Sequence, residues 1–248
     1  MQVVMDQIPV LPPPPPLADI DRSALFLDFD GTLVGIADTP DAILVPGDLG
    51  ARLGLLSQKL NGRLALISGR AVDDLGRHLG DMSFARAGSH GMARYGRDGI
   101  LRGDEPLPIP PQVNDALRDF AAREGVMFEA KPHGGALHFR IRPEAMDAVN
   151  RFAEELALKF GMSVKVGKQV TEVVHRGADK GEAVRAFMRD AEFFDSTPIF
   201  VGDDVTDEDG FTAVADLGGF GVIVGDRRPT AARYQLASVA EVHQWLGL

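Results

Sequence analysis

Two apolar runs in this chain end abruptly in carboxylates, and this feature constrains the fold most. Residues 25–30 read Leu-Phe-Leu-Asp-Phe-Asp, and residues 199–204 read Ile-Phe-Val-Gly-Asp-Asp. A short apolar run of this kind is typical of a buried strand in a parallel sheet, and ligands bind at the carboxyl ends of such strands. One Asp-x-Asp alone would equally suit a solvated loop that caps a helix. Two such strand ends favour a shared site.

Carboxylates that meet at one edge of a sheet repel each other unless a cation lies between them. The chain has no cysteine, which also excludes disulfides, zinc-thiolate sites and thiol catalysis. Oxygen ligands without sulfur or imidazole favour a hard cation. The sequence therefore predicts Mg²⁺ as the cofactor.

Strand and helix patterns alternate through most of the chain. The first half offers strands at 25–27 and 64–67, near Phe84 and in a hairpin that turns at 96–99, with helices over 48–60 and 71–79. The pattern resumes with a helix over 180–189, strands at 199–201 and 222–224, and a helix after Thr206. This alternation predicts an α/β fold with a doubly wound, Rossmann-like parallel-sheet core over 21–104 and 174–248.

The middle of the chain has a different pattern. After the proline-rich break at 106–111, helices are expected near 113–123 and over 143–160, and strands at 127–131, at 136–141 and near Ser163 and Val170. Two helices with adjacent strands indicate a small unit of their own. We therefore expect an inserted α+β cap domain over 105–173.

The first 20 residues form a proline-rich tail with five consecutive prolines, Pro12 to Pro16. Such a run favours an extended polyproline conformation. It suits a solvated arm or a packing strap better than a ligand for a partner domain.

Composition limits the partners. The net charge of −10 disfavours nucleic acid and anionic membranes as partners. No basic residue precedes Arg22, and no uncharged apolar run approaches the length of a membrane span. We expect a cytoplasmic, monomeric enzyme that acts on a small molecule.

The carboxylate motifs resemble those of the haloacid dehalogenase superfamily of phosphotransferases. Four motifs occur in the family's order: Asp-x-Asp-Gly-Thr at 28–32, a hydroxyl residue at Ser68, a lysine at Lys180 that opens a helix, and the acidic pair Asp203 and Asp204. Each lies at an expected strand end or helix start.

This resemblance implies a role for each motif residue. Asp28 would be the nucleophile that forms an aspartyl phosphate, and Asp30 the general acid and base. Ser68 and the backbone donors after it would bind phosphate oxygens, and Lys180 would help to neutralise the repulsion between phosphate and nucleophile. Mg²⁺ would be held by Asp28, the backbone carbonyl of Asp30 and Asp203, with support from Asp204 or Asp207.

Within the superfamily, the chain is most similar to trehalose-phosphate phosphatases, which have the second type of cap domain. The matching segments surround the residues that the resemblance assigns to substrate binding, namely Arg70, His90, Lys131, His138, Arg140, Lys168 and Glu172. The resemblance implies a sugar phosphate as substrate, trehalose 6-phosphate in particular.

A disaccharide presents many hydroxyl groups, and Lys131, Lys168 and Glu172 can each bond to them. Any one of them alone would equally be an ordinary exposed charge on a strand. His90 could be a buried histidine in a glycine-rich turn. The alternatives are a phosphatase of sucrose phosphate or mannosyl-glycerate phosphate, and a non-catalytic sugar-phosphate sensor, which has less support because both Asp28 and Asp30 are present.

Overall fold

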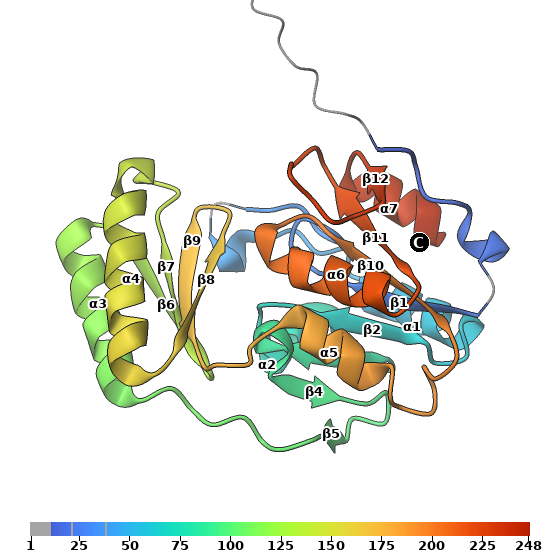
Figure 1. The fold of residues 1–248 in the computed structure, drawn as a ribbon, viewed down its shortest axis with the longest axis horizontal. Helices are drawn as coiled ribbons and strands as arrows, with labels where there is room; N and C mark the ends of the chain where they lie inside the picture. Colours follow the sequence, from blue (N-terminus) through green and yellow to red (C-terminus); the bar gives the residue numbers. More distant parts are fainter. Residues whose placement is uncertain (1–10, 21, 38) are drawn as a thin grey trace, which may run out of the picture.

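The computed structural model describes residues 11–20, 22–37 and 39–248, so the first ten residues of the expected tail lie outside it. Figure 1 shows two units joined by extended segments: a core with a large sheet and helices on both faces, and a smaller unit with one sheet and two helices. The predicted α/β core with an inserted α+β cap is confirmed.

The core sheet has eight strands in the order β12-β11-β10-β1-β2-β3-β4-β5. Their bounds are β1 (Ser23–Leu27), β2 (Leu64–Ile67), β3 (Ala85–Gly88), β4 (Ala93–Tyr95), β5 (Leu101–Arg102), β10 (Thr197–Gly202), β11 (Phe220–Val224) and β12 (Tyr234–Leu236). All neighbours from β12 to β3 are parallel, and β4 and β5 form the expected antiparallel hairpin. The strand order reverses at β1, so β1 and β10 flank the point where ligands bind in such folds.

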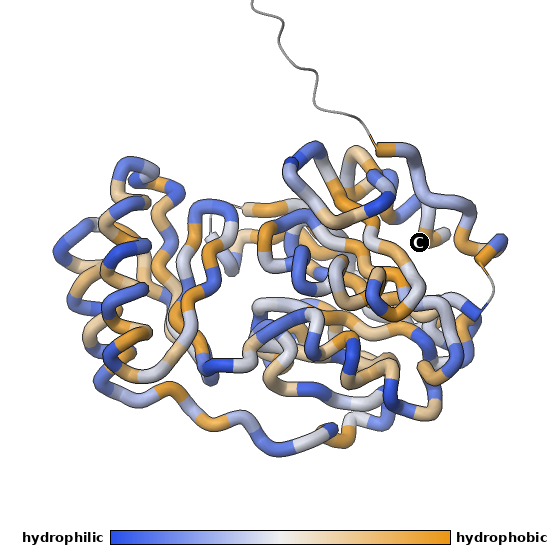
Figure 2. Tube along the Cα trace, in the orientation of Figure 1, coloured by the Kyte–Doolittle hydropathy of each residue, from blue (hydrophilic) through white to orange (hydrophobic). Residues whose placement is uncertain are grey.

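Helices cover both faces of this sheet because its central strands are buried on both sides. The helices are α1 (Leu49–Lys59), α2 (Val72–Leu79), α5 (Lys180–Phe187), α6 (Glu208–Asp216) and α7 (Val239–Leu246). Leu25 and Leu27 belong to the apolar cluster that includes residues of α1, α2 and α7, whereas Ala24 and Phe26 belong to the cluster with α5 and α6. The central strands β1, β2 and β11 are therefore buried along their whole length, and hydrophobic segments gather inside the core in Figure 2.

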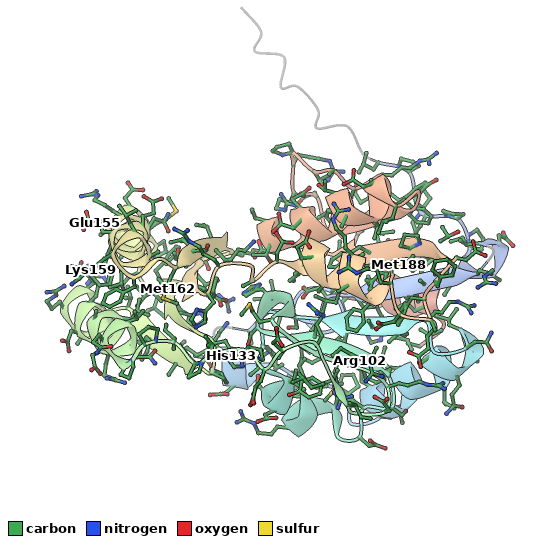
Figure 3. All side chains as sticks on the ribbon, turned by 60° about the horizontal axis from the view of Figure 1, so that its bottom comes forward. Arg102, His133, Glu155, Lys159, Met162 and Met188 are labelled. Atoms are coloured by element: carbon green, nitrogen blue, oxygen red, sulfur yellow. The ribbon has the colours of Figure 1, made fainter. Side chains whose placement is uncertain are left out.

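The cap unit is an antiparallel sheet in the order β6-β7-β9-β8, backed by two helices. Its elements are α3 (Pro111–Glu124), β6 (Met127–Lys131), β7 (Gly134–His138), α4 (Met146–Phe160), β8 (Ser163–Gly167) and β9 (Val170–Val174). Leu137 and Val173 lie in the apolar cluster that the two helices complete. Figure 3 shows Glu155 and Lys159 of α4 at the end of the molecule far from the core. The opposite face of the cap sheet is polar and turns toward the core.

The proline segment lies against the core as a packing strap. The Trp245 indole Nε1 donates a hydrogen bond of 2.8 Å to the Pro15 carbonyl, and the Gln235 amide donates one of 3.0 Å to the Pro12 carbonyl. Leu17 and Ile20 pack on the core cluster. In Figure 1 this blue segment runs beside α7 and β12.

The expected strand over 136–141 was wrong at both ends, since β7 spans Gly134–His138. The Phe139 amide donates to the Gln169 carbonyl and the Arg142 amide donates to the Phe139 carbonyl, so the chain turns there. Strand β12 and helix α7 were not predicted. Within the described ranges, no helix combines the length and the apolar composition that a membrane span needs.

Candidate active site

Two of the predicted carboxylates meet at the carboxyl ends of the two central strands. Asp28 follows β1 and Asp203 follows β10, and these strands are parallel neighbours. The loops approach so closely that a Cβ atom on Gly31, at φ +82°, would lie 2.2 Å from Asp203 Oδ2. Only glycine satisfies both that contact and that backbone conformation.

Asp28, Asp203 and Asp207 form a cluster that is able to hold a metal ion. Each offers a carboxylate oxygen, and the three oxygens lie within 4.8 Å of one another. Burial, with the charges of Asp207 and Asp204, raises the pKa of Asp203 to about 7. Burial and the Asp207 charge also raise the pKa of Asp28. The buried Asp203 Oδ1 has no hydrogen-bond partner among the described residues. An unpartnered oxygen in a set of repelling carboxylates fits a hard divalent cation.

Lys180 supplies a buried positive charge beside this cluster. Its Nζ donates to Asp28 Oδ1 at 2.8 Å and to Asp207 Oδ1 at 2.6 Å. Burial opposes its charge, but the charges of Asp207 and Asp28 raise the pKa of Lys180 above its usual value. Lys180 opens α5, whose N-cap residue Asp179 accepts hydrogen bonds from two backbone amides.

Asp207 holds the acidic loop in shape. Its side chain is fully buried, and its Oδ2 accepts hydrogen bonds of 2.9 Å from the amides of both Asp203 and Asp204. Its Oδ1 is bonded to Lys180. Since both oxygens have protein partners, Asp207 suits a supporting position behind Asp28 and Asp203.

Asp30 is paired with Arg70. Arg70 Nε donates to Asp30 Oδ2 at 2.7 Å and Arg70 Nη2 donates to Asp30 Oδ1 at 2.8 Å. The same guanidinium donates to Asp74 at 2.7 Å and to the Pro40 carbonyl at 2.8 Å. Ser68 is buried, and its Oγ accepts a hydrogen bond of 3.1 Å from the backbone amide of Arg70. Arg70, predicted to bind substrate, thus donates two hydrogen bonds to Asp30.

Glu172 of β9 joins the cap to the core. Its Oε1 accepts a hydrogen bond of 2.8 Å from Lys131 of β6, and its Oε2 lies 3.1 Å from Nε2 of the core residue His90. Lys131 Nζ also reaches the Gly69 carbonyl at 3.3 Å. Although burial opposes the charge of Glu172, Lys131 and His90 lower the pKa of its carboxyl well below the usual range.

The hairpin of β8 and β9 makes a second contact with the core. The Lys168 amide donates to Asp204 Oδ2 at 3.1 Å, and Lys165 Nζ donates to Asp209 Oδ2 of α6 at 2.7 Å. A Cβ atom on Gly167 would lie 2.7 Å from Asp204 Oδ2, so the turn of this hairpin fits closely against the acidic loop.

One pocket of about 130 Å³ lies between these groups and is lined by both units. Twelve residues singled out from the sequence line it: Asp28, Asp30, Ser68, Arg70, His90, Lys131, Arg140, Lys168, Glu172, Lys180, Asp203 and Asp204. Asp28, Asp203 and Lys180 lie on its core side, and the charged groups of the cap sheet lie on the other. The pocket can therefore hold a phosphate against the core while the cap contacts its alcohol.

The family model for trehalose-phosphatase matches residues 26–240. This chain belongs to the trehalose-phosphatase family. It is 39% identical over 230 residues to a trehalose-6-phosphate phosphatase of Escherichia coli (strain K12), covering 91% of this chain and 85% of that protein. It is 36% identical over 233 residues to a probable trehalose-phosphate phosphatase of Sinorhizobium fredii, covering 93% and 87%.

Solved structures agree with this assignment at the level of the fold. The C-terminal domain of Candida albicans trehalose-6-phosphate phosphatase superposes with a TM-score of 0.79 at 21% identity, covering 93% of this chain and 92% of that one. A haloalkanoate-superfamily phosphatase of Bacteroides thetaiotaomicron gives a TM-score of 0.59 at 16% identity, covering 90% and 92%.

Two residues singled out from the sequence, His138 and Asp207, are not among those that line the pocket. His138 Nε2 instead lies 2.8 Å from Oε2 of Glu129, which does line it. Glu129 was not predicted, although it precedes Lys131 by two residues and so lies on the same face of β6. Thr206 was not predicted as a pocket residue either. The same holds for the uncharged residues that line the pocket from the loop after β1, namely Ile36, Ala37, Thr39, Pro40 and Ile43.

Proposed function

We propose that this chain is a Mg²⁺-dependent phosphatase that hydrolyses trehalose 6-phosphate to trehalose and phosphate. The observation that carries this proposal is the shared pocket, in which Asp28, Asp203 and Lys180 of the core face Lys131 and Glu172 of the cap. Membership of the trehalose-phosphatase family and the names of the two bacterial relatives support the same substrate.

Asp28 is the proposed nucleophile. A carboxylate about 4 Å from a phosphate dianion faces roughly 4 kcal/mol of repulsion per charge at an effective dielectric of about 20, so attack requires neutralisation. Lys180, bonded to Asp28 at 2.8 Å, supplies one positive charge. Asp28, the backbone carbonyl of Asp30 and Asp203 would hold Mg²⁺, which would neutralise further charge on the phosphate and on the nucleophile.

Asp30 is the proposed proton carrier. As Asp28 bonds to phosphorus and the phosphorus–oxygen bond to the sugar breaks, Asp30 gives its proton to the leaving oxygen. Asp30 then accepts a proton from the water that attacks the aspartyl phosphate, and the bond to Asp28 breaks. Arg70 engages both oxygens of Asp30 in this structure, so Asp30 must exchange that partner before it delivers a proton.

The cap is proposed to read the sugar. Glu129, Lys131, Lys168 and Glu172 line the side of the pocket opposite the nucleophile, and the chemistry at phosphorus does not need them. Carboxylates accept hydrogen bonds from sugar hydroxyls, and ammonium groups donate to them. Ser68 is buried and lines the same pocket as Asp28, so its hydroxyl suits a phosphate oxygen.

We further propose that residues 105–173 act as a cap domain, bounded by the linkers before α3 and after β9. The His133 ring lies 3.1 Å from the Leu107 carbonyl, and the His175 ring lies 3.1 Å from the Pro108 carbonyl, so both histidines hold the first linker.

Monomeric state and cytoplasmic location remain predictions.

A phosphate-release screen tests the proposed function. The purified chain with Mg²⁺ is compared on trehalose 6-phosphate, sucrose 6-phosphate, mannosyl-glycerate phosphate, glucose 6-phosphate and a small aryl phosphate. We expect the highest kcat/KM on trehalose 6-phosphate and no turnover after chelation of the metal. A different preferred sugar phosphate would overturn the substrate, and no turnover of any phosphomonoester would overturn the enzyme class.

A further inference from the structure

His138 lies next to the pocket without lining it. It ends β7, and its side chain is 10% exposed. In the register of the cap sheet, Glu129 of β6 pairs with Ala136, two residues before His138. Side chains two apart on a strand share a face, so His138 and Glu129 both lie on the face that turns toward the core. Their side chains meet there, at 2.8 Å between Nε2 and Oε2.

The partner determines how the His138 ring is used. An ionised carboxylate only accepts hydrogen bonds, so Nε2 carries the hydrogen and donates it to Glu129. The other ring nitrogen, Nδ1, is buried and has no partner in the described part of the chain. An N–H at Nε2 is satisfied by Glu129, whereas one at Nδ1 would be buried and unsatisfied. The ring thus has one polar contact in this structure, and that contact is Glu129.

Glu129 in turn has its Oε2 engaged by His138, and its side chain is 31% exposed and lines the pocket. Burial opposes its charge, but the hydrogen bond from His138 and the charge of Lys131 lower the pKa of the Glu129 carboxyl. The group is therefore an ionised acceptor at neutral pH. Oε2 is engaged by His138 and no residue that the structure describes is bonded to Oε1, so Oε1 is the oxygen left for a ligand.

We propose that His138 is a positioning residue that fixes Glu129 as the acceptor for a hydroxyl group of the leaving sugar. This inference rests on the proposed function and deepens it. His138 itself makes no contact with substrate in this account, so the assignment of His138 to direct substrate binding is replaced by an action through Glu129. Its removal should cost substrate binding only while Glu129 is present.

A double-mutant cycle tests this dependence. His138→Leu removes the donor at similar volume, His138→Gln retains a donor, and Glu129→Ala removes the acceptor. The cycle uses the sugar phosphate that the wild-type enzyme hydrolyses best in the screen above. Glu155→Ala, on the outer face of α4, is the matched control in the same unit (Figure 3).

We expect His138→Leu to lose about tenfold in kcat/KM, mostly as a higher KM, because a hydrogen bond to a charged group is lost. His138→Gln should stay within about threefold of wild type, and adding His138→Leu to Glu129→Ala should cost no more than about twofold further. Hydrolysis of a small aryl phosphate by His138→Leu should be unchanged, since only the core contacts that substrate.

Two outcomes would overturn the inference without touching the proposed function: a full tenfold loss on adding His138→Leu to Glu129→Ala, or equal losses on the aryl and the sugar phosphate. The first would show that His138 acts independently of Glu129, and the second that it only supports the fold. A wild-type preference for another sugar phosphate would overturn the substrate alone, because the cycle would still report on His138. Failure to prefer any sugar phosphate over the aryl phosphate would overturn both.

Discussion

Glu172 Oε2 of the cap and His90 Nε2 of the core lie 3.1 Å apart, and the other oxygen of Glu172 is bonded to Lys131 at 2.8 Å. One buried carboxylate in the lining of the pocket therefore contacts both units. Ser89 and His90 adopt positive φ angles of 51° and 55°, so the core backbone takes up a sparsely populated conformation at this contact. In the proposed function, the group that reads the sugar also joins the cap to the core.

Substitution of Glu172 should separate recognition from chemistry. We expect Glu172→Ala to lose about 1.5 to 3 kcal/mol of transition-state stabilisation on trehalose 6-phosphate, which is roughly ten- to more than a hundredfold in kcat/KM. A small aryl phosphate makes no contact with the cap, so its hydrolysis should change little. Parallel losses on the two substrates would instead indicate general damage, and undiminished turnover of trehalose 6-phosphate would remove Glu172 from the sugar site.

The ion pair between Lys165 of the cap and Asp209 of the core should stabilise the contact between the two units. Lys165 Nζ and Asp209 Oδ2 are 2.7 Å apart and both side chains are partly exposed, so the ion pair contributes about 0.2 to 1 kcal/mol to this contact. We expect Lys165→Met to raise KM about two- to fivefold with little change in kcat, and Lys159→Met on the outer face of α4 to have no effect. The charge exchange Lys165→Asp with Asp209→Lys should restore KM. No recovery would contradict a role for the pair.

The metal-free protein should lose stability as pH rises. The pKa of Asp203 is raised to about 7 in the folded protein, above its unfolded value near 3.8, so the folded state binds the extra proton. This contribution is complete below about pH 4 and is lost as pH rises through 7. At pH 8 without metal, we expect Asp203→Asn to raise Tm by about 2–4 °C, which corresponds to about 1 kcal/mol. Mg²⁺ should raise Tm of the wild type more than that of the variant.

A lower Tm for metal-free Asp203→Asn than for metal-free wild type at pH 8 would show that repulsion does not dominate this cluster. An equal response of the two proteins to Mg²⁺ would remove Asp203 from the metal site. Both readings come from thermal unfolding and need no substrate.

Removal of the proline strap should cost stability but not activity. Residues 11–18 contain no group of the pocket, yet Pro12 and Pro15 accept hydrogen bonds from Gln235 and Trp245. We expect deletion of residues 1–18 to lower Tm by several degrees and to leave kcat/KM unchanged. Each kcal/mol of lost unfolding free energy lowers Tm by about 2–4 °C in a chain of this size. Deletion of residues 1–10 is the matched control. An unchanged Tm after the longer deletion would show that the strap contributes nothing.

The sequence predicts the core of this site well because the relevant residues follow strand ends. Asp28 and Asp203 each come directly after an apolar run, and adjacent parallel strands bring such positions together. The strap illustrates what composition leaves open. Five prolines favour an extended conformation, but they do not show that Trp245, 230 residues away, would hold it against α7.

Contacts between the two units could not be predicted from the sequence. The pairing of Lys165 with Asp209 depends on how the cap sits on the core, which no local pattern encodes. The attachment of Arg70 to Asp30 depends likewise on the meeting of two loops. Glu129 could have been predicted from the sequence, because side chains alternate along β6 and so place Glu129 on the same face as Lys131. His138 was singled out, but its partner becomes visible only with the strand register.

The proposed reaction, with Asp28 as its nucleophile, is tested most directly by phosphate release from trehalose 6-phosphate with Mg²⁺, measured for wild type and for Asp28→Asn. We expect wild type to turn this substrate over and the activity of Asp28→Asn to fall by about a thousandfold or more, because an amide is no nucleophile. A thermal unfolding curve checks that the variant is folded. Release by Asp28→Asn above a few per cent of wild type would contradict the assignment of Asp28 and with it the proposed mechanism.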